Sequence, residues 1–274
     1  MVDNLLRHLG SGSAAVIAGG PRMGKTTFLQ QIAAAVDGVV QPIPIDLATT
    51  SQRVLVQWIS TAGDPAAHLP SLLLIDGCER LLPDPGPFIH EIDQAARHFG
   101  ERLAGNQLAS SVWAGNARWG EWAMANRSTF TGPVRYYPLI VLPPKEARLF
   151  LKRRWPADVP SSELEWVMEL SGGHPYLLAQ MVGGPKRDFD PFFAELWKEA
   201  DSAAERHIIA QLVEAKSWVL LQDLHDETGG AALKPVLDRL AVTGLINRTL
   251  IDGAAAAALV SPLLADWIRR TRQS

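Results

Sequence analysis

The sequence of 274 residues contains a single cysteine, Cys78, which excludes an internal disulfide and a cysteine-cluster zinc site. It has no apolar run of the roughly 18 uncharged residues that a membrane-spanning helix needs. Its first residues lack a basic region followed by an apolar core, so we expect no secretory signal and a cytoplasmic protein. A net charge of −3 provides no general attraction to nucleic acids or anionic membranes.

One stretch near the start of the chain carries a strong chemical pattern. The apolar residues 14–18 predict a strand, and the turn that follows matches G-x-x-x-x-G-K-[ST]. In such a loop, glycines let successive N–H groups curl around phosphates, and the helix that follows adds its positive N-terminal end. Lys25 would supply charge to the β- and γ-phosphates, and Thr26 a hydroxyl to Mg²⁺. The predicted nucleotide-binding residues are Gly19, Gly20, Pro21, Arg22, Met23, Gly24, Lys25, Thr26 and Thr27.

Strands and helices alternate through the first half of the chain, which predicts an α/β fold with a parallel sheet. Strands are expected at 14–18, 39–47, 71–76, 108–114 and 134–142. Prolines in the second of these indicate an edge strand. Helices are expected at 3–9, 26–36, 51–58, 87–104 and 119–125. Together these elements predict the five-stranded parallel sheet of a P-loop NTPase.

The pattern changes after Pro143-Pro144, and the residues that follow predict helices alone. These helices are expected at 145–154, 161–172, 174–183 and 189–203. The last part predicts helices at 204–214, 218–227 and 231–243. A strand at 244–248, a turn at Asp252-Gly253, an apolar return at 257–260 and a last helix at 262–272 then follow. Three helices and a β-hairpin in this order resemble a winged helix. We therefore predict a core at 1–143, a helical lid at 144–203 and a C-terminal winged helix at 204–274.

A phosphate loop also needs a carboxylate that holds Mg²⁺ through water, normally at the end of an apolar strand beside the first strand. Asp76 ends the apolar run 72–75 and is the candidate. Many ATPases of the additional-strand type place a glutamate directly after this aspartate, whereas Gly77 stands here. Glu79 is the nearest substitute as catalytic base, and its alternative is a solvated loop acid. We therefore expect ATP or ADP binding with Mg²⁺ and slow hydrolysis.

Polar residues after the fourth strand are candidates for sensing the γ-phosphate. Asn116 and Arg118 occupy this place, and the alternative for Arg118 is a surface ion pair. Arg127 could act as an arginine finger on a neighbouring subunit, but an exposed loop arginine is the reading we favour.

Four segments together resemble the STAND group of NTPases, which are relatives of AAA+ proteins. Residues 19–27 resemble their phosphate loop, and residues 73–82 resemble the Walker B region of bacterial and archaeal members. Residues 139–147 resemble their link into the helical lid, and residues 170–178 resemble their G-x-P lid motif. By this resemblance, Pro175 packs near the adenine and His174 faces the nucleotide phosphates. The same two residues also fit a helix start with proline near its first position.

The resemblance implies a nucleotide switch, in which ADP holds core, lid and winged helix closed and ATP opens them for assembly into an oligomer. It also implies roles in signalling, transcription control, or bacterial conflict and defence. STAND proteins usually carry an effector domain before the core and sensor repeats after it, and this sequence contains neither. We therefore expect the effector and sensor to be separate proteins, or the chain to work as an adaptor.

A second hypothesis is a DNA-associated ATPase of the replication-initiator or transposition-regulator kind, using the winged helix on DNA. Residues 203–274 hold eight Lys and Arg against eight Asp and Glu, whereas a DNA-binding module normally has a basic face. The expected recognition helix at 231–240 has few residues suited to reading base edges. We therefore favour a packing role for the winged helix over contact with DNA.

Overall fold

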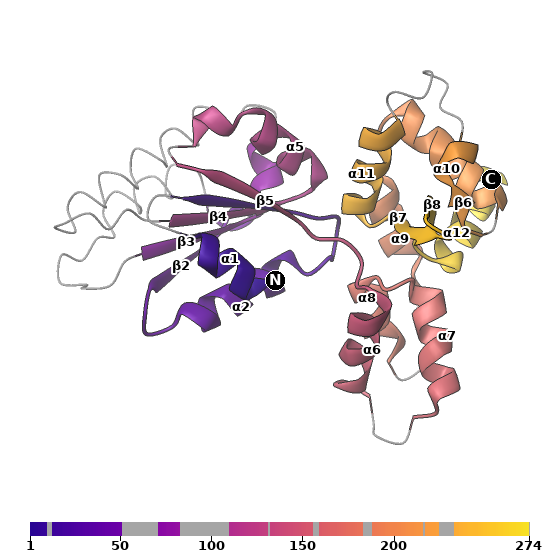
Figure 1. The fold of residues 1–274 in the computed structure, drawn as a ribbon, viewed down its shortest axis with the longest axis horizontal. Helices are drawn as coiled ribbons and strands as arrows, with labels where there is room; N and C mark the ends of the chain where they lie inside the picture. The colour runs from indigo at the N-terminus through magenta and orange to yellow at the C-terminus, as the bar shows by residue number, and fades with distance from the viewer. Residues whose placement is uncertain are drawn as a thin grey trace. The chain divides into compact units, whose positions relative to one another are not determined.

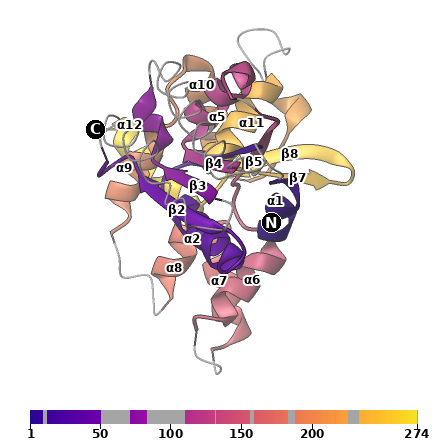
Figure 2. The same ribbon diagram turned by 90° about the vertical axis from the view of Figure 1, so that its left-hand side faces the viewer.

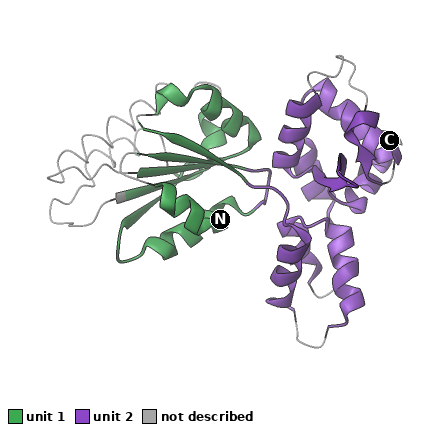
Figure 3. Cartoon of the chain, viewed as in Figure 1, with its two compact units in different colours: residues 1–18, 24–138 green, residues 19–23, 139–274 purple. Residues whose placement is uncertain are grey.

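The computed structural model describes residues 1–9, 13–50, 71–82, 110–130, 132–155, 159–182, 188–215, 217–224 and 233–273. The chain forms two compact units, one of residues 1–18 and 24–138 and the other of residues 19–23 and 139–274 (Figure 3). The helices expected at 51–58 and 87–104 lie outside the described residues. Within the described part of the chain, no helix combines the length and apolar character that a membrane crossing requires.

The first unit is built on a five-stranded parallel sheet with the strand order β2-β3-β4-β1-β5 (Figure 1). Its strands are β1 (Ala14–Ala18), β2 (Gln41–Asp46), β3 (Ser71–Asp76), β4 (Ser110–Gly115) and β5 (Val134–Pro138). Its helices are α1 (Val2–His8), α2 (Lys25–Val36), α5 (Ala117–Ala125) and the 3₁₀ turns η1 (Cys78–Leu81) and η2 (Arg127–Thr129). The predicted α/β fold with a five-stranded parallel sheet is confirmed.

The position of each strand follows from its residues. All five residues of β1 are buried, as expected of a strand with neighbours on both edges and helices on both faces. Figure 1 shows α2 on one face of the sheet and α5 on the other. The strand β2 carries Pro42 and Pro44, and it lies at the edge of the sheet as predicted. Proline has no N–H to donate, so it fits a strand with one unpaired edge.

Two expectations about the sheet are wrong. The strand that ends at Asp76 was expected beside the first strand, but β4 lies between β3 and β1. Sequence order does not reveal this because a crossover can skip a position that a later strand fills. The fifth strand was expected to reach residue 142 but ends at Pro138, and residues from Leu139 onward belong to the second unit. The absent N–H of Pro138 is consistent with an end to strand pairing there.

The second unit contains helices and a small antiparallel sheet with the order β6-β8-β7. Its first helices are α6 (Pro144–Lys152), α7 (Ser161–Ser171), α8 (Pro175–Met181) and α9 (Asp190–Trp197). The rest comprises α10 (Ala203–Ala215), β6 (Val219–Leu220), the 3₁₀ turn η3 (Leu221–Asp223), α11 (Leu233–Thr243), β7 (Ile246–Ile251), β8 (Ala254–Leu259) and α12 (Pro262–Gln273). Figure 2 shows β7 and β8 as an extended hairpin. Asp252 and Gly253 form its turn, with φ angles of 51° and 83°.

The helix expected at 218–227 is wrong over its described part. Val219 and Leu220 form a strand paired with Ala257 and Ala256, and residues 221–223 form the turn η3. The apolar, β-branched start of this segment pairs with an alanine-rich strand, and this tertiary contact overrides local helix preference. The remainder of that helix, residues 225–227, lies outside the described residues.

One continuous apolar core runs through the second unit. It includes buried residues from Ala147 on α6 to Ile268 on α12, with Phe192, Leu212 and Leu240 between them. The segments predicted as lid and as winged helix therefore share a core. The boundary proposed between them at residues 203 and 204 stays a prediction.

The end of α7 is locked to the hairpin by close backbone packing. Gly172 follows α7 with a φ of 55°, and a Cβ there would lie 1.4 Å from the carbonyl oxygen of Val260. The side-chain amide of Asn247 donates a hydrogen bond of 2.9 Å to the Gly172 carbonyl. The hydroxyl of Ser261 donates to the carbonyl of Leu170. Only glycine satisfies both the left-handed backbone and the close approach.

Gly172→Ala should therefore lower the free energy of unfolding by about 3 kcal/mol or more, as measured by urea denaturation. Gly253→Ala is the matched control, because Gly253 also has a positive φ but nothing lies within 4 Å of its Cβ position. That control should lose only the about 1–2 kcal/mol of left-handed strain. Equal losses in the two variants would show that the contact with Val260 is unimportant.

Candidate functional site

The loop after β1 is curled by two left-handed residues. Arg22 has a φ of 56° and Gly24 a φ of 90°, and α2 begins directly afterwards at Lys25. Left-handed residues in a short loop turn neighbouring N–H groups to one side, which produces an anion-binding concavity. The N-terminus of α2, a helix of 12 residues, adds partial positive charge at the same point. Positive charge from the backbone therefore gathers at the start of α2, and phosphate binding by residues 19–27 stays a prediction.

In the first unit, a hydrogen bond joins the first turn of α2 to the end of β3. The hydroxyl of Thr26 donates to Oδ2 of Asp76 over 2.5 Å, and the N–H of Gly77 donates to Oδ1 over 2.9 Å. A hydroxyl beside a carboxylate offers the hard oxygen ligands that Mg²⁺ prefers. The residues present thus fit a magnesium ion, with Thr26 as ligand and Asp76 acting directly or through water. Lys25 and Thr27 lie on the same first turn of α2.

Glu79 lies in the turn η1, directly after the strand that ends at Asp76. Its Oε2 atom is buried and has no hydrogen-bond partner among the described residues. Burial, followed by the negative charges of Glu79 and Asp76, raises the pKa of the Cys78 thiol well above its ordinary value. Cys78 is thus an inert, protonated thiol, and the two carboxylates lie on either side of it in sequence. The role of Glu79 as catalytic base stays a prediction.

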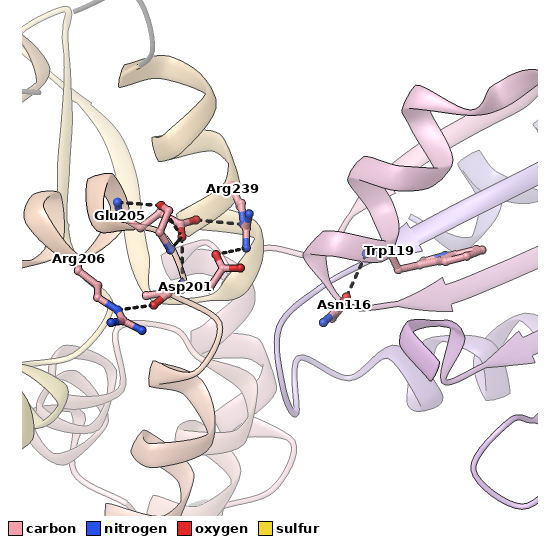
Figure 4. A network of polar contacts seen from close by, with 8 residues as sticks. Asn116, Trp119, Asp201, Glu205, Arg206 and Arg239 are labelled. Atoms are coloured by element: carbon pink, nitrogen blue, oxygen red, sulfur yellow. Dashed lines mark hydrogen bonds and ion pairs between the residues drawn. The ribbon is translucent and has the colours of Figure 1, made fainter. Parts of the chain in front are cut away.

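The residues predicted to sense the γ-phosphate lie at the end of β4. Asn116 caps α5, and its Oδ1 accepts a hydrogen bond of 3.0 Å from the N–H of Trp119 (Figure 4). This fixed oxygen leaves the amide NH₂ group of Asn116 as the part that can donate to a ligand. Arg118 is exposed on the first turn of α5. Arg127 donates from Nε to the carbonyl of Met124 over 3.0 Å, in keeping with the exposed loop role that the sequence favours.

In the second unit, residues 19–23 lie against the connection from α11 to β7. The N–H of Gly20 donates to the carbonyl of Val242 over 2.9 Å, and Met23 is buried. The Cβ position of Gly244, in that connection, lies 3.0 Å from Sδ of Met23 and 3.3 Å from Nε2 of His174. Met23 and His174, which are 151 positions apart, therefore flank the same turn.

His174 is buried and caps α8, the helix in which Pro175 is the first residue. Its Nδ1 accepts a hydrogen bond of 3.3 Å from the N–H of Tyr176, so the ring proton sits on Nε2. Nε2 has no hydrogen-bond partner among the described residues. Burial lowers the pKa of His174 to about 3, so the ring is neutral at pH 7. His174 thus keeps one buried N–H donor, and its expected role toward a phosphate stays a prediction.

Two residues near the loop were missed by sequence reasoning. Tyr176 and Glu195 both contact the side chain of Arg22 within the second unit. Tyr176 lies inside the motif at 170–178 and could have been singled out as an aromatic residue next to Pro175. Glu195 gives no signal in the sequence, because it is one of many acids and lies 173 positions from Arg22.

No protein-family model and no curated protein matches this chain. Solved structures match, and the three described below have low identity and TM-scores under 0.5. A STAND protein with a tetratricopeptide repeat sensor from Pyrococcus horikoshii has 13% identity and a TM-score of 0.43. That match covers 99% of this chain, which spans only 42% of the length of the STAND protein.

Two further structures are similar to a comparable degree. RuvB from Thermotoga maritima, a Holliday junction branch migration motor, has 18% identity and a TM-score of 0.45, covering 93% of this chain and 87% of that one. The AAA domain of FIGL-1 in complex with ADP has 18% identity and a TM-score of 0.41, covering 83% and 71%. The P-loop NTPase fold of the first unit rests on its own strand order and on the loop between β1 and α2.

The burial of His174 makes stability depend on pH. The folded protein keeps His174 neutral down to about pH 3, whereas the unfolded chain binds a proton below pH 6.5. The stability that depends on the neutral ring is therefore complete above pH 6.5 and is lost progressively as the pH falls toward 3, at up to about 1.4 kcal/mol per pH unit. His174→Asn retains a capping oxygen but cannot titrate.

Urea unfolding of this variant between pH 7 and 4 should therefore show a shallower loss of stability than the wild type. Parallel curves for the two proteins would contradict the assignment of a neutral, buried His174.

Proposed function

We propose that this protein binds ATP and ADP with Mg²⁺ and acts as a slowly hydrolysing molecular switch of the STAND or AAA+-like type. The observation that carries the proposal is the hydrogen bond from Thr26 to Asp76. It brings the hydroxyl that follows Lys25 together with the carboxylate at the end of β3, as a metal–phosphate site requires.

Each predicted residue has a role in this proposal. The N–H groups at the start of α2 and the charge of Lys25 bind the phosphates, while Thr26 and Asp76 hold the magnesium ion. Glu79 accepts the proton of the attacking water, and Asn116 and Arg118 contact the γ-phosphate. His174 donates its Nε2–H to a phosphate, and Pro175 packs near the adenine. When bound, Mg²⁺ offsets negative charge that develops on the phosphate oxygens.

Hydrolysis is slow in this proposal because the residue directly after Asp76, where many ATPases of the additional-strand type have a glutamate, is not an acid. Gly77, which has a φ of 78°, occupies the position directly after Asp76. The only acidic side chain that follows within the same turn is Glu79, in η1. A base that is displaced from the position for in-line attack contributes less to the rate. Slow turnover suits a switch whose state is set by the nucleotide that it holds.

The nucleotide state would control a separate partner protein or effector, in signalling or in bacterial conflict and defence. We propose a core at residues 1–143, a lid at 144–203 and a winged helix at 204–274, with ATP promoting assembly of several copies in the cytoplasm. This chain is similar to a STAND protein that has a tetratricopeptide repeat sensor, and this chain spans 42% of the length of that protein. A sensor of that kind would fit the role of a separate partner.

The alternative, a DNA-associated ATPase, is less well supported, because acids neutralise the basic side chains of the proposed winged helix. Lys234 and Arg248 both pair with Asp238. Burial alone would raise the pKa of the Asp238 carboxyl, but the hydrogen bonds and charges of these two bases lower it. Arg239 pairs with Glu205 and Asp201 (Figure 4). A DNA-binding face keeps such bases available for phosphates. DNA binding that rises with ATP and falls steeply with salt would overturn this preference.

Variants of Glu79 and Asp76 should distinguish effects on nucleotide binding from effects on the rate of hydrolysis. Glu79→Gln should lower the rate of ATP hydrolysis at least about tenfold and change nucleotide affinity by less than about threefold, because it removes the base alone. Asp76→Asn should also lower hydrolysis and should weaken the dependence of the remaining rate on Mg²⁺. Phosphate release assays over a range of Mg²⁺ concentrations measure both effects. Hydrolysis as fast in both variants as in the wild type would refute these two roles.

A further inference from the structure

Arg22 adopts a backbone conformation that its residue type disfavours. It is one of two non-glycine residues in the described chain with a positive φ, at 56°, and it lies in the curled loop between β1 and α2. A side chain in the left-handed region is strained, which is why glycine usually occupies such positions. The curl at Arg22 nevertheless sets the path of the loop into the left-handed Gly24 and the start of α2. Something must therefore stabilise Arg22 in this conformation.

The side chain of Arg22 is held at two points within the second unit. Its Nε donates to Oε2 of Glu195 on α9 over 3.1 Å. Its guanidinium lies 4.5 Å from the centre of the Tyr176 ring on α8 and 5.7 Å from that of Phe192 on α9. The two rings pack together with their centres 4.7 Å apart, so they form one aromatic surface.

These contacts are individually modest. The side chains of Arg22 and Glu195 are 43% and 45% exposed, so solvent screens their ion pair. The cation–π contact adds a comparable contribution and also fixes the plane of the guanidinium. Acting together on one side chain, they are of the size needed to offset the strain of a single left-handed residue.

We propose that Glu195 and Tyr176 are positioning residues for the phosphate loop, and that they hold the backbone of Arg22 in its curled conformation through the Arg22 side chain. This inference rests on the proposed function, because the curled loop is the one that binds phosphate. If the contacts are lost, the loop populates other conformations. The apparent nucleotide affinity is then the intrinsic affinity multiplied by the fraction of molecules whose loop stays curled.

The test is the affinity for fluorescently labelled ADP in the presence of Mg²⁺, measured by equilibrium titration. Glu195→Gln should bind about two- to fivefold more weakly than the wild type. The loss of a negative charge should by itself favour an anionic ligand, so weaker binding points to the loop. Glu165→Gln is the matched control, because it removes an acid that pairs with Arg148 on α6 over 2.5 Å, with a comparable exposure of 56%.

Variants of Arg22 distinguish positioning from a general loss of packing. Arg22→Ala loses the contacts and keeps the strain, so it should bind ADP about tenfold more weakly than the wild type. Arg22→Gly loses the same contacts but adopts a positive φ freely, so it should bind about fivefold more tightly than Arg22→Ala. In the Arg22→Gly background, Glu195→Gln should have no further effect on affinity.

Hydrogen exchange of the nucleotide-free protein gives a readout that does not depend on binding. Exchange at residues 19–24 should be faster in Glu195→Gln than in the wild type and unchanged in Glu165→Gln. Equal affinities and equal exchange in wild type and Glu195→Gln would overturn the positioning role while leaving nucleotide binding intact. A wild type that binds no ADP would refute the proposed function, and the exchange result would still decide whether Glu195 holds the loop.

Discussion

The first unit depends on the hydrogen bond from the Thr26 hydroxyl to Asp76. It ties the first turn of α2 to the end of β3, although β4 lies between that strand and β1, the strand that leads to α2. A parallel sheet places the carboxyl ends of its strands on one edge, so a loop after one strand can meet a side chain after another. Asp76 ends β3, Glu79 comes shortly after it, and Asn116 follows β4. The chemistry proposed for the protein requires this convergence.

The second unit depends on apolar packing together with a buried ionic network. Glu205 is 2% exposed and accepts hydrogen bonds from the N–H groups of Asp201 and Ser202 and from the Ser202 hydroxyl. It also pairs with Arg239 across 3.0 Å, which joins α10 to α11 (Figure 4). Removing one partner of such a pair leaves a buried charge without compensation, which is strongly destabilising. Arg239 thus stabilises the unit, a role that competes with any contact to DNA.

The sequence predicted the features that depend on local pattern. The strands β1 and β3, the helix α2, the edge position of β2 and the hairpin turn at Asp252 all follow from apolar runs, proline or glycine. The features that it missed depend on contacts between distant residues. The insertion of β4 beside β1, the pairing of Val219 with Ala257, and the contact of Arg22 with Glu195 are set by tertiary packing. The pattern of the loop predicts phosphate binding, but it gave no sign of the contacts that Arg22 makes with Glu195 and Tyr176.

The central claim is that the loop at residues 19–27 binds a nucleoside phosphate. The most direct measurement is ³¹P NMR of ADP with Mg²⁺, titrated with the wild-type chain and with Lys25→Ala. Lys25 supplies the charge nearest the phosphates in the proposed site, whereas Lys152, which is exposed at the end of α6, provides a matched control as Lys152→Ala. The account predicts a saturable shift of the β-phosphorus signal at one nucleotide per chain for the wild type and Lys152→Ala, and none for Lys25→Ala. An equal shift with Lys25→Ala, or no shift with the wild type, would contradict it.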